Sequence, residues 1–213
     1  MNQNQSGALA LVGSGEYLPE AQELEAELLR FGISRGKSNT YIQIPTAAGK
    51  EGEDRLDFWR QRGADQAERI GCEVKYLPVL TREDAHNQSW INEIGKAGLI
   101  YFSGGDPVHL ADVFRNTPLW QAIMKAWREG ASLAGCSAGA MAFGGKIIKC
   151  NEIKHGKIDK MKHFGHDIFK NIETNFLATR YHSLIIDRNT LSKDFIITAE
   201  TNNKIIMGIA HTQ

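Results

Sequence analysis

One pentapeptide combines the residue types and the spacing that nucleophilic catalysis requires. The sequence GCSAG at residues 135–139 follows an apolar run and precedes small residues that favour a helix. A serine in Gly-x-Ser-x-Gly sits on a sharp strand-to-helix turn, and the flanking glycines remove side chains that would clash there. The pattern predicts Ser137 as a nucleophile. Cys136 occupies the position before the serine, so we expect it to point away from the apex and to pack in the structure.

A second glycine-rich turn could supply the oxyanion hole that acyl transfer needs. The sequence SGGD at residues 103–106 follows a strand-like apolar run, so a backbone N–H of Gly104 or Gly105 could be one donor. The N–H of Ala138 would be the other, and losing one such donor costs about 10²–10³ in rate. A further turn, GSGE at residues 13–16, lacks the complete Gly-x-Gly-x-x-Gly spacing. We therefore expect no dinucleotide and no other cofactor.

The base that would activate the serine has three candidates. A nucleophilic serine needs a histidine within hydrogen-bond reach, itself oriented by a carboxylate. His182, in the segment RYHS, follows a strand-like run and is the favoured base; His163 and His155 are the alternatives. Glu152, which follows the strand after the elbow, is the candidate orienting acid.

Two histidines and an aspartate also suggest a metal. His163, His166 and Asp167 form His-x-x-His-Asp, and zinc requires three or four converging ligands. Nothing else in the sequence completes that set, so we predict a solvated polar loop and no metal.

Composition restricts the class of protein. The 213 residues carry 25 Lys and Arg against 25 Asp and Glu, so there is no basic surface field for nucleic acid. Such neutrality permits self-association, and a homodimer is possible. Three cysteines fit a reducing compartment, the N-terminus does not read as a signal peptide, and the apolar runs are too short to span a membrane. We expect a cytoplasmic protein.

The elements that must position these residues alternate through the first two-thirds of the chain. Helices are predicted at residues 19–31, 51–71 and 120–128, and strands at residues 8–12, 41–44, 74–77, 99–102 and 132–135. This alternation predicts a mainly parallel sheet covered on both faces. From about residue 144 lysine and histidine become frequent, and four strands, at residues 146–148, 179–186, 194–198 and 204–209, predict an antiparallel extension. We predict one α/β domain over residues 1–213.

Five motifs resemble the cyanophycinase and dipeptidase E family of serine peptidases. They are VGSGEY (12–17), IPTAAG (44–49), PVLTREDA (78–85), IYFSGGDPVHL (100–110) and AGCSAGAMAFG (134–144). The resemblance covers residues 8–144. It implies a flavodoxin-like, class I glutamine amidotransferase-like three-layer sandwich, with Ser137 as nucleophile and the Gly104-Gly105 turn in the oxyanion hole. It also implies small peptides, or peptide-like polymers rich in aspartyl bonds, as substrates.

The remainder is similar to a different family, the glutaminase subunit of anthranilate or aminodeoxychorismate synthase. The similar segments are GGKIIKCNEIKHGKI (144–158), HDIFKNI (166–172), ATRYHSLIIDRNTL (178–191) and IMGIAHTQ (206–213). That family uses a Cys-His-Glu triad, but its Gly-x-Cys-Leu-Gly elbow is not present, and the resemblance stops before its His-Pro-Glu segment. The sequence therefore resembles a chimera, with a peptidase-like portion at residues 1–144 and an amidotransferase-like portion at residues 145–213.

Three hypotheses follow. The chain is a serine hydrolase that cleaves small peptides or aspartyl-type amide bonds through an acyl-enzyme on Ser137. Alternatively, it is a glutaminase-type subunit that supplies ammonia to a synthase partner. The third possibility is a folded hybrid whose triad is incomplete and which has no activity.

Overall fold

The computed structural model describes residues 6–166 and 169–212. The chain forms two compact units, Met1–Ala140 and Met141–Gln213. The division falls close to residue 144, where the sequence begins to be rich in lysine and histidine.

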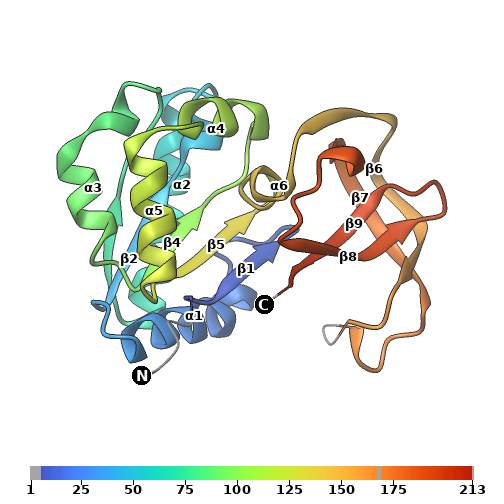
Figure 1. Cartoon of the computed structure of the whole chain (residues 1–213), viewed down its shortest axis with the longest axis horizontal. Coiled ribbons are helices and arrows are strands. Elements are labelled where there is room, and N and C mark those ends of the chain that lie inside the picture. Colours follow the sequence, from blue (N-terminus) through green and yellow to red (C-terminus); the bar gives the residue numbers. More distant parts are fainter. Residues whose placement is uncertain (1–5, 167–168, 213) are drawn as a thin grey trace. The chain divides into compact units, whose positions relative to one another are not determined.

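The first unit is built on a five-stranded parallel sheet (Figure 1). Its strand order is β1-β5-β4-β2-β3. The strands are β1 (Leu9–Val12), β2 (Thr40–Ile44), β3 (Glu73–Tyr76), β4 (Leu99–Phe102) and β5 (Ser132–Cys136). Every residue of β2, β4 and β5 is buried, which explains why their sequences read as continuous runs and not as an alternation. The carboxyl ends of β1, β2, β4 and β5 share one edge of the sheet, where ligands bind in open α/β sheets.

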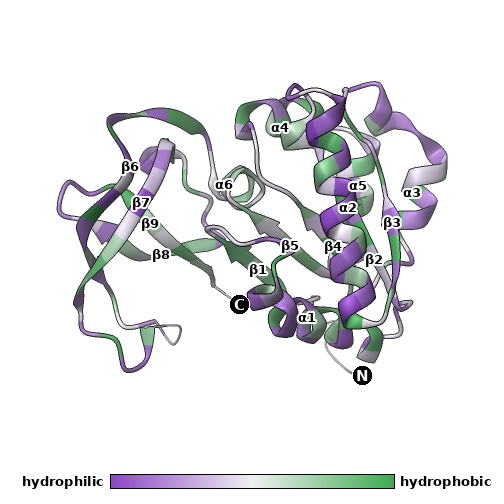
Figure 2. Cartoon of the chain, turned by 180° about the vertical axis from the view of Figure 1, so that it is seen from behind, coloured by the Kyte–Doolittle hydropathy of each residue, from purple (hydrophilic) through white to green (hydrophobic). Residues whose placement is uncertain are grey.

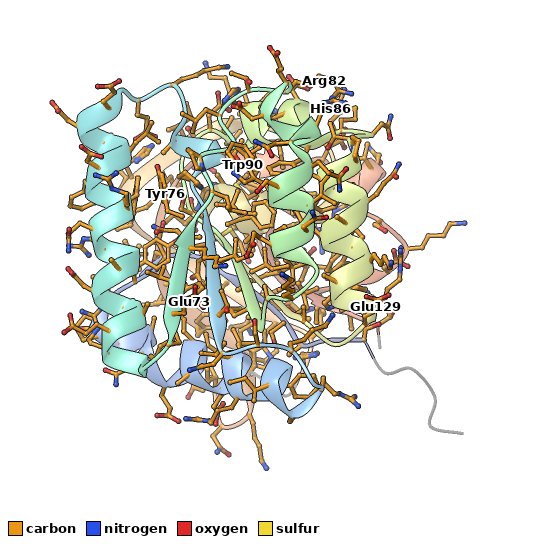
Figure 3. The ribbon with its side chains drawn as sticks, turned by 90° about the vertical axis from the view of Figure 1, so that its left-hand side faces the viewer. Glu73, Tyr76, Arg82, His86, Trp90 and Glu129 are labelled. Carbon is orange, nitrogen blue, oxygen red and sulfur yellow. The ribbon has the colours of Figure 1, made fainter. Side chains whose placement is uncertain are left out.

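Helices cover both faces of this sheet, as predicted. The helical segments are η1 (Pro19–Ala21), α1 (Gln22–Ser34), η2 (Thr46–Ala48), α2 (Glu53–Ile70), η3 (Asp84–His86), α3 (Gln88–Ile94), α4 (Pro107–Phe114), α5 (Pro118–Arg128) and α6 (Ala138–Gly144). Figure 3 looks onto the edge strand β3, which carries Glu73 and Tyr76, with α2 on one side of the sheet and α3 and α5 on the other. Helix α1 contacts α2 as well as β4 and β5. The result is a three-layer α/β unit.

The helices pack through one face each. Along α5 the buried residues are Leu119, Ile123 and Ala126, which recur at helical spacing. Figure 2 shows hydrophilic and hydrophobic residues together on the helices around the sheet. Across the described ranges, no helix combines the length and the apolar character that crossing a membrane requires.

The second unit is an antiparallel sheet of strand order β7-β6-β8-β9. Its strands are β6 (Ile147–His163), β7 (Asn175–Ile186), β8 (Phe195–Thr201) and β9 (Ile206–His211), with a 3-10 turn, η5 (Arg188–Thr190), after β7. The antiparallel extension predicted from the sequence is confirmed, and three of its four strands lie close to their predicted positions.

The first strand of this unit corrects the sequence prediction. We expected a strand at residues 146–148 and a solvated polar loop that includes His163, but β6 runs for 17 residues and ends at His163, whose side chain is buried. Its inward side chains, Cys150, Met161 and His163, are buried, whereas most of its lysines face solvent. The pairing of β6 with β7 contains two irregularities in register, and across them β6 keeps one buried and one exposed face. The many charged residues lie on the solvated face of this strand, and they made the sequence read as a loop and not as a strand.

Candidate active site

Ser137 lies at the apex of the turn between β5 and α6. Its φ of +50° is in the left-handed region, which a residue with a side chain rarely adopts outside constrained sites. Ser137 is exposed while both of its chain neighbours are buried, and its N–H donates to the carbonyl of Val12 at 2.8 Å. The turn therefore presents the hydroxyl to solvent at the carboxyl edge of the sheet.

The glycines on either side are required by close packing. A Cβ at Gly135 would lie 2.6 Å from the backbone of Gly139, and a Cβ at Gly139 would lie 2.4 Å from the carbonyl oxygen of Phe102. Real Cβ atoms do not approach backbone atoms so closely. The local geometry is therefore that of a nucleophile elbow.

Cys136 is buried beneath the elbow. Its thiol donates to Glu16 Oε2 at 2.8 Å. Burial raises the pKa of this thiol well above its ordinary value, and the neighbouring Glu16 carboxylate raises it further. Cys136 therefore stays protonated at neutral pH, and a protonated thiol is a poor nucleophile.

The glycine turn after β4 adjoins the elbow. A Cβ at Gly104 would lie 3.3 Å from Ser137 Cβ and 2.9 Å from Glu16 Oε1. Gly105 has a φ of +140°, and a Cβ there would lie 2.3 Å from the carbonyl oxygen of Ala47. Only glycine fits both positions without displacing a neighbour.

The amides of this turn have different partners. The Ser103 N–H donates to Ile44 O at 3.2 Å and the Asp106 N–H to Ala47 O at 2.7 Å. The Gly104 N–H donates to Glu16 Oε1 at 3.1 Å. Within residues 6–166 and 169–212, no hydrogen-bond acceptor is found for the N–H of Gly105 or of Ala138.

Glu16 is the residue that the sequence analysis missed. It is 9% exposed, and its two carboxylate oxygens accept hydrogen bonds from the Gly104 amide and from the Cys136 thiol. The signal was present in the GSGE turn, which the sequence analysis considered for nucleotide-binding spacing and as part of the VGSGEY motif, but not for a role of its carboxylate. A carboxylate directly after a glycine turn, at the carboxyl end of a strand of the parallel sheet, is a candidate site residue in its own right.

His182, the predicted base, belongs to β7 of the second unit. Its Nδ1 lies 3.0 Å from Leu184 O, which requires the proton on Nδ1 and leaves Nε2 as the basic nitrogen. Arg180 Nε donates to that Nε2 at 3.1 Å. Burial lowers the pKa of His182, and the charge of Arg180 lowers it further, so the ring is neutral at pH 7.

Glu152, the predicted acid, also lies in the second unit, on β6. Its carboxylate pairs with Lys154 Nζ at 3.2 Å and accepts from Asn203 Nδ2 at 3.2 Å. The carbonyl of Leu184, and not this carboxylate, holds the Nδ1 of His182. The structure thus brings Ser137, Gly104 and Gly105 together in one unit and places the predicted acid and base in the other.

The alternative histidines differ in burial. His163 is buried, stacks on Phe169 with ring centroids 4.7 Å apart, and uses both ring nitrogens with the backbone of Gly165 and Ile172. His155 is exposed on β6. For the metal hypothesis, Asp167 lies outside the described residues, and the residues that are described contain no group of three or more metal-binding side chains.

Fold and elbow together define the class of this protein: an α/β protein built on a parallel sheet, with a serine at a nucleophile elbow. The family model for peptidase family S51 matches residues 9–175. The chain belongs to this family. The match contains nearly all of the stretch predicted to resemble serine peptidases and continues past residue 144.

A solved structure supports the assignment. It is described as a peptidase from an acI-B1 Actinobacterium and is 54% identical to this chain, with a TM-score of 0.66. The comparison covers 68% of this chain and 59% of the other.

The resemblance to glutaminase subunits is also found, over a shorter stretch. The chain is 52% identical to anthranilate synthase component 2 of Pyropia yezoensis over 68 residues, which is 32% of this chain and 36% of that protein. It is 38% identical to aminodeoxychorismate synthase component 2 of Escherichia coli (strain K12) over 79 residues, which is 37% of this chain and 42% of that protein. The chain thus spans well under half the length of these two relatives.

Proposed function

We propose that the protein hydrolyses amide bonds of small peptides, aspartyl-type bonds among them, through an acyl-enzyme on Ser137. The observation that carries the proposal is the exposed, left-handed Ser137 beside the Gly104-Gly105 turn. Membership of a peptidase family makes a peptide the favoured substrate class.

In the proposed reaction, Ser137 Oγ attacks the substrate carbonyl while its proton passes to the base. The carbonyl oxygen becomes an oxyanion, which backbone amides at the elbow and the neighbouring turn would stabilise. The protonated base then gives its proton to the leaving amine as the amide bond breaks. Water deprotonated by the same base attacks the ester in turn, releasing the acid and restoring Ser137.

The free amides suggest which donors hold the oxyanion. Gly105 and Ala138 favour this role because their N–H groups have no acceptor among the described residues. The N–H of Gly104 would serve only if it left Glu16 Oε1, to which it now donates. We therefore propose Gly105 and Ala138 as the primary donors.

His182 remains the proposed base. Support comes from its neutral ring and from the proton on Nδ1, which leaves Nε2 to receive a proton. For this role Nε2 must exchange Arg180 for the Ser137 hydroxyl. Glu152 stays the proposed acid, although a backbone carbonyl now occupies the orienting position at Nδ1.

A fluorophosphonate probe tests the nucleophile directly. The wild-type protein and Cys136→Ala should each acquire one covalent adduct on Ser137, read by intact-mass spectrometry and peptide mapping. Ser137→Ala should acquire none and should lose hydrolysis of aspartyl dipeptides. A wild-type protein that stays unlabelled while its thermal transition shows it to be folded would contradict the proposal.

Glutamine hydrolysis is the second candidate, favoured by the identity to component 2 subunits. It predicts release of ammonia from glutamine that is abolished in Cys136→Ala. The raised pKa of the Cys136 thiol and its hydrogen bond to Glu16 oppose it. A folded protein with neither reaction would be the inactive hybrid.

A further inference from the structure

The Glu16 carboxylate joins the two halves of the proposed oxyanion site. One oxygen accepts the amide of Gly104, which is 88 residues away in the sequence, and the other accepts the thiol of Cys136, 120 residues away. Glu16 thereby connects the turn after β4 to the strand that carries the nucleophile. Because the carboxylate is almost fully buried, water does not compete for these two hydrogen bonds.

The backbone beside Glu16 is held by a second set of contacts, at Tyr17. Tyr17 has a φ of +59°, its N–H donates to Glu25 Oε1 at 3.3 Å, and its carbonyl accepts from Arg69 at 2.7 Å. Its ring is buried against Tyr41 and Tyr101. A non-glycine residue keeps such a conformation only when its surroundings hold it there. The backbone next to Glu16 is therefore held by the packing of Tyr17, in addition to the two contacts that the Glu16 carboxylate makes.

The hydrogen bond from the Gly104 amide to Glu16 also affects the amide of Gly105. With Ser103, Gly104 and Asp106 each bonded within the protein, the turn is held along its length and the Gly105 amide is left over. Without Glu16, Gly104 would have an unpaired buried amide, and the peptide could rotate to find another acceptor. That rotation would turn the Gly105 amide away from the reacting carbonyl.

We propose that Glu16 is a positioning residue of the peptidase site, holding the Gly104-Gly105 turn against the elbow so that the Gly105 amide faces the substrate oxyanion. This inference rests on the proposed function. Glu16 itself touches neither the substrate nor the Ser137 hydroxyl in this role.

Two variants of Glu16 separate positioning from stability. Glu16→Gln keeps an oxygen that accepts the Gly104 amide, whereas Glu16→Ala removes the acceptor altogether. We expect kcat for aspartyl-dipeptide hydrolysis to fall about 10²-fold in Glu16→Ala, with KM changed by less than about threefold, since an oxyanion donor acts mainly in the transition state. Glu16→Gln should stay within about tenfold of wild type even if both variants melt at the same lowered temperature.

A readout independent of catalysis completes the test. Hydrogen exchange of the Gly104 amide, followed by NMR, should be slow in wild type and Glu16→Gln and at least about tenfold faster in Glu16→Ala. Wild-type kcat in Glu16→Ala, equal losses in both variants, or unchanged exchange at Gly104 would each overturn the inference. If the wild-type protein hydrolyses no peptide, the proposed function fails, and the exchange experiment still decides whether Glu16 holds the turn.

Discussion

The two units hold their polar groups by different means. In the first, the proposed catalytic groups are backbone amides and one exposed hydroxyl, placed by turns that only glycine or a strained residue can make. In the second, a fully buried arginine, Arg180, bonds Asp159, the carbonyl of Glu152 and the ring of His182. The comparison shows that the proposed nucleophile depends on backbone geometry, whereas the proposed base depends on a charged network.

Removing the proposed base, His182, should lower the rate of hydrolysis more than any other substitution discussed below. His182→Ala is expected to lower kcat about 10²–10⁴-fold, the usual contribution of a general base. Because burial lowers the pKa of His182, the wild-type rate should rise with pH to a plateau reached by about pH 7. Steady-state kinetics between pH 5 and 9 measure both.

The matched control is His155→Ala, which removes an exposed histidine from the neighbouring strand. It should keep the wild-type plateau rate, and because the charge of His155 helps to lower the pKa of His182, its pH profile should shift to slightly higher pH. If His155→Ala loses activity and His182→Ala does not, the assignment of the base is wrong. A rate that continues to climb well above pH 8 would contradict a base with a lowered pKa.

A single methyl group at Gly105 should displace the turn that carries the proposed oxyanion donor. Gly105→Ala places a Cβ against the Ala47 carbonyl at a φ of +140°, so the turn must move and take its amide with it. We expect kcat to fall about 10²–10³-fold. Gly95→Ala is the control, because its nearest contacts are 3.7 and 4.0 Å and its φ is ordinary. Fluorophosphonate labelling rates compare the two, and similar rates in both variants would remove Gly105 from the site.

The smallest expected effects contrast a buried ion pair with a surface one. Hydrogen bonds from Lys154 and Arg180 lower the pKa of Asp159 to about 2. Asp159→Asn leaves Arg180 buried with one anionic partner fewer and should lower the free energy of unfolding by about 3 kcal/mol at pH 7. Arg30→Ala, which breaks an exposed pair with Glu23, should cost less than about 1 kcal/mol.

Urea denaturation measures both differences, and their pH dependence gives a further check. A carboxylate whose pKa is lower in the folded state stabilises the fold above its unfolded pKa and loses that stabilisation as pH falls toward the folded value. The deficit of Asp159→Asn should therefore be complete at pH 7 and shrink between about pH 4 and pH 2. An equal deficit across this range would mean that the charge of Asp159 contributes nothing.

Much of the fold was predictable because buried parallel strands are visible as apolar runs. The prediction at residues 99–102 coincides with β4, and that at residues 41–44 lies within β2. The short helices α3 and α4 were not predicted from the sequence, although Asn87 and Asp106 cap them and Pro107 is the first residue of α4. Seven or eight residues give too little periodicity to register, and only the caps mark such helices. Strand β6 was predicted only at residues 146–148, because the charged residues beyond that point concealed the alternation of buried and exposed side chains.

The sequence by itself determined the elbow, because the strain at Ser137 and the glycines on either side are local and appear within five consecutive residues. It left open whether Gly104 or Gly105 supplies an amide to the site. The tertiary structure brings Glu16 from 88 residues away to accept the Gly104 N–H, and this contact is why we propose the Gly105 amide. Hydrogen-bond acceptors at such separation depend on how strands and turns assemble, and no local pattern records them. The role of a turn residue is set by what the fold places beside it.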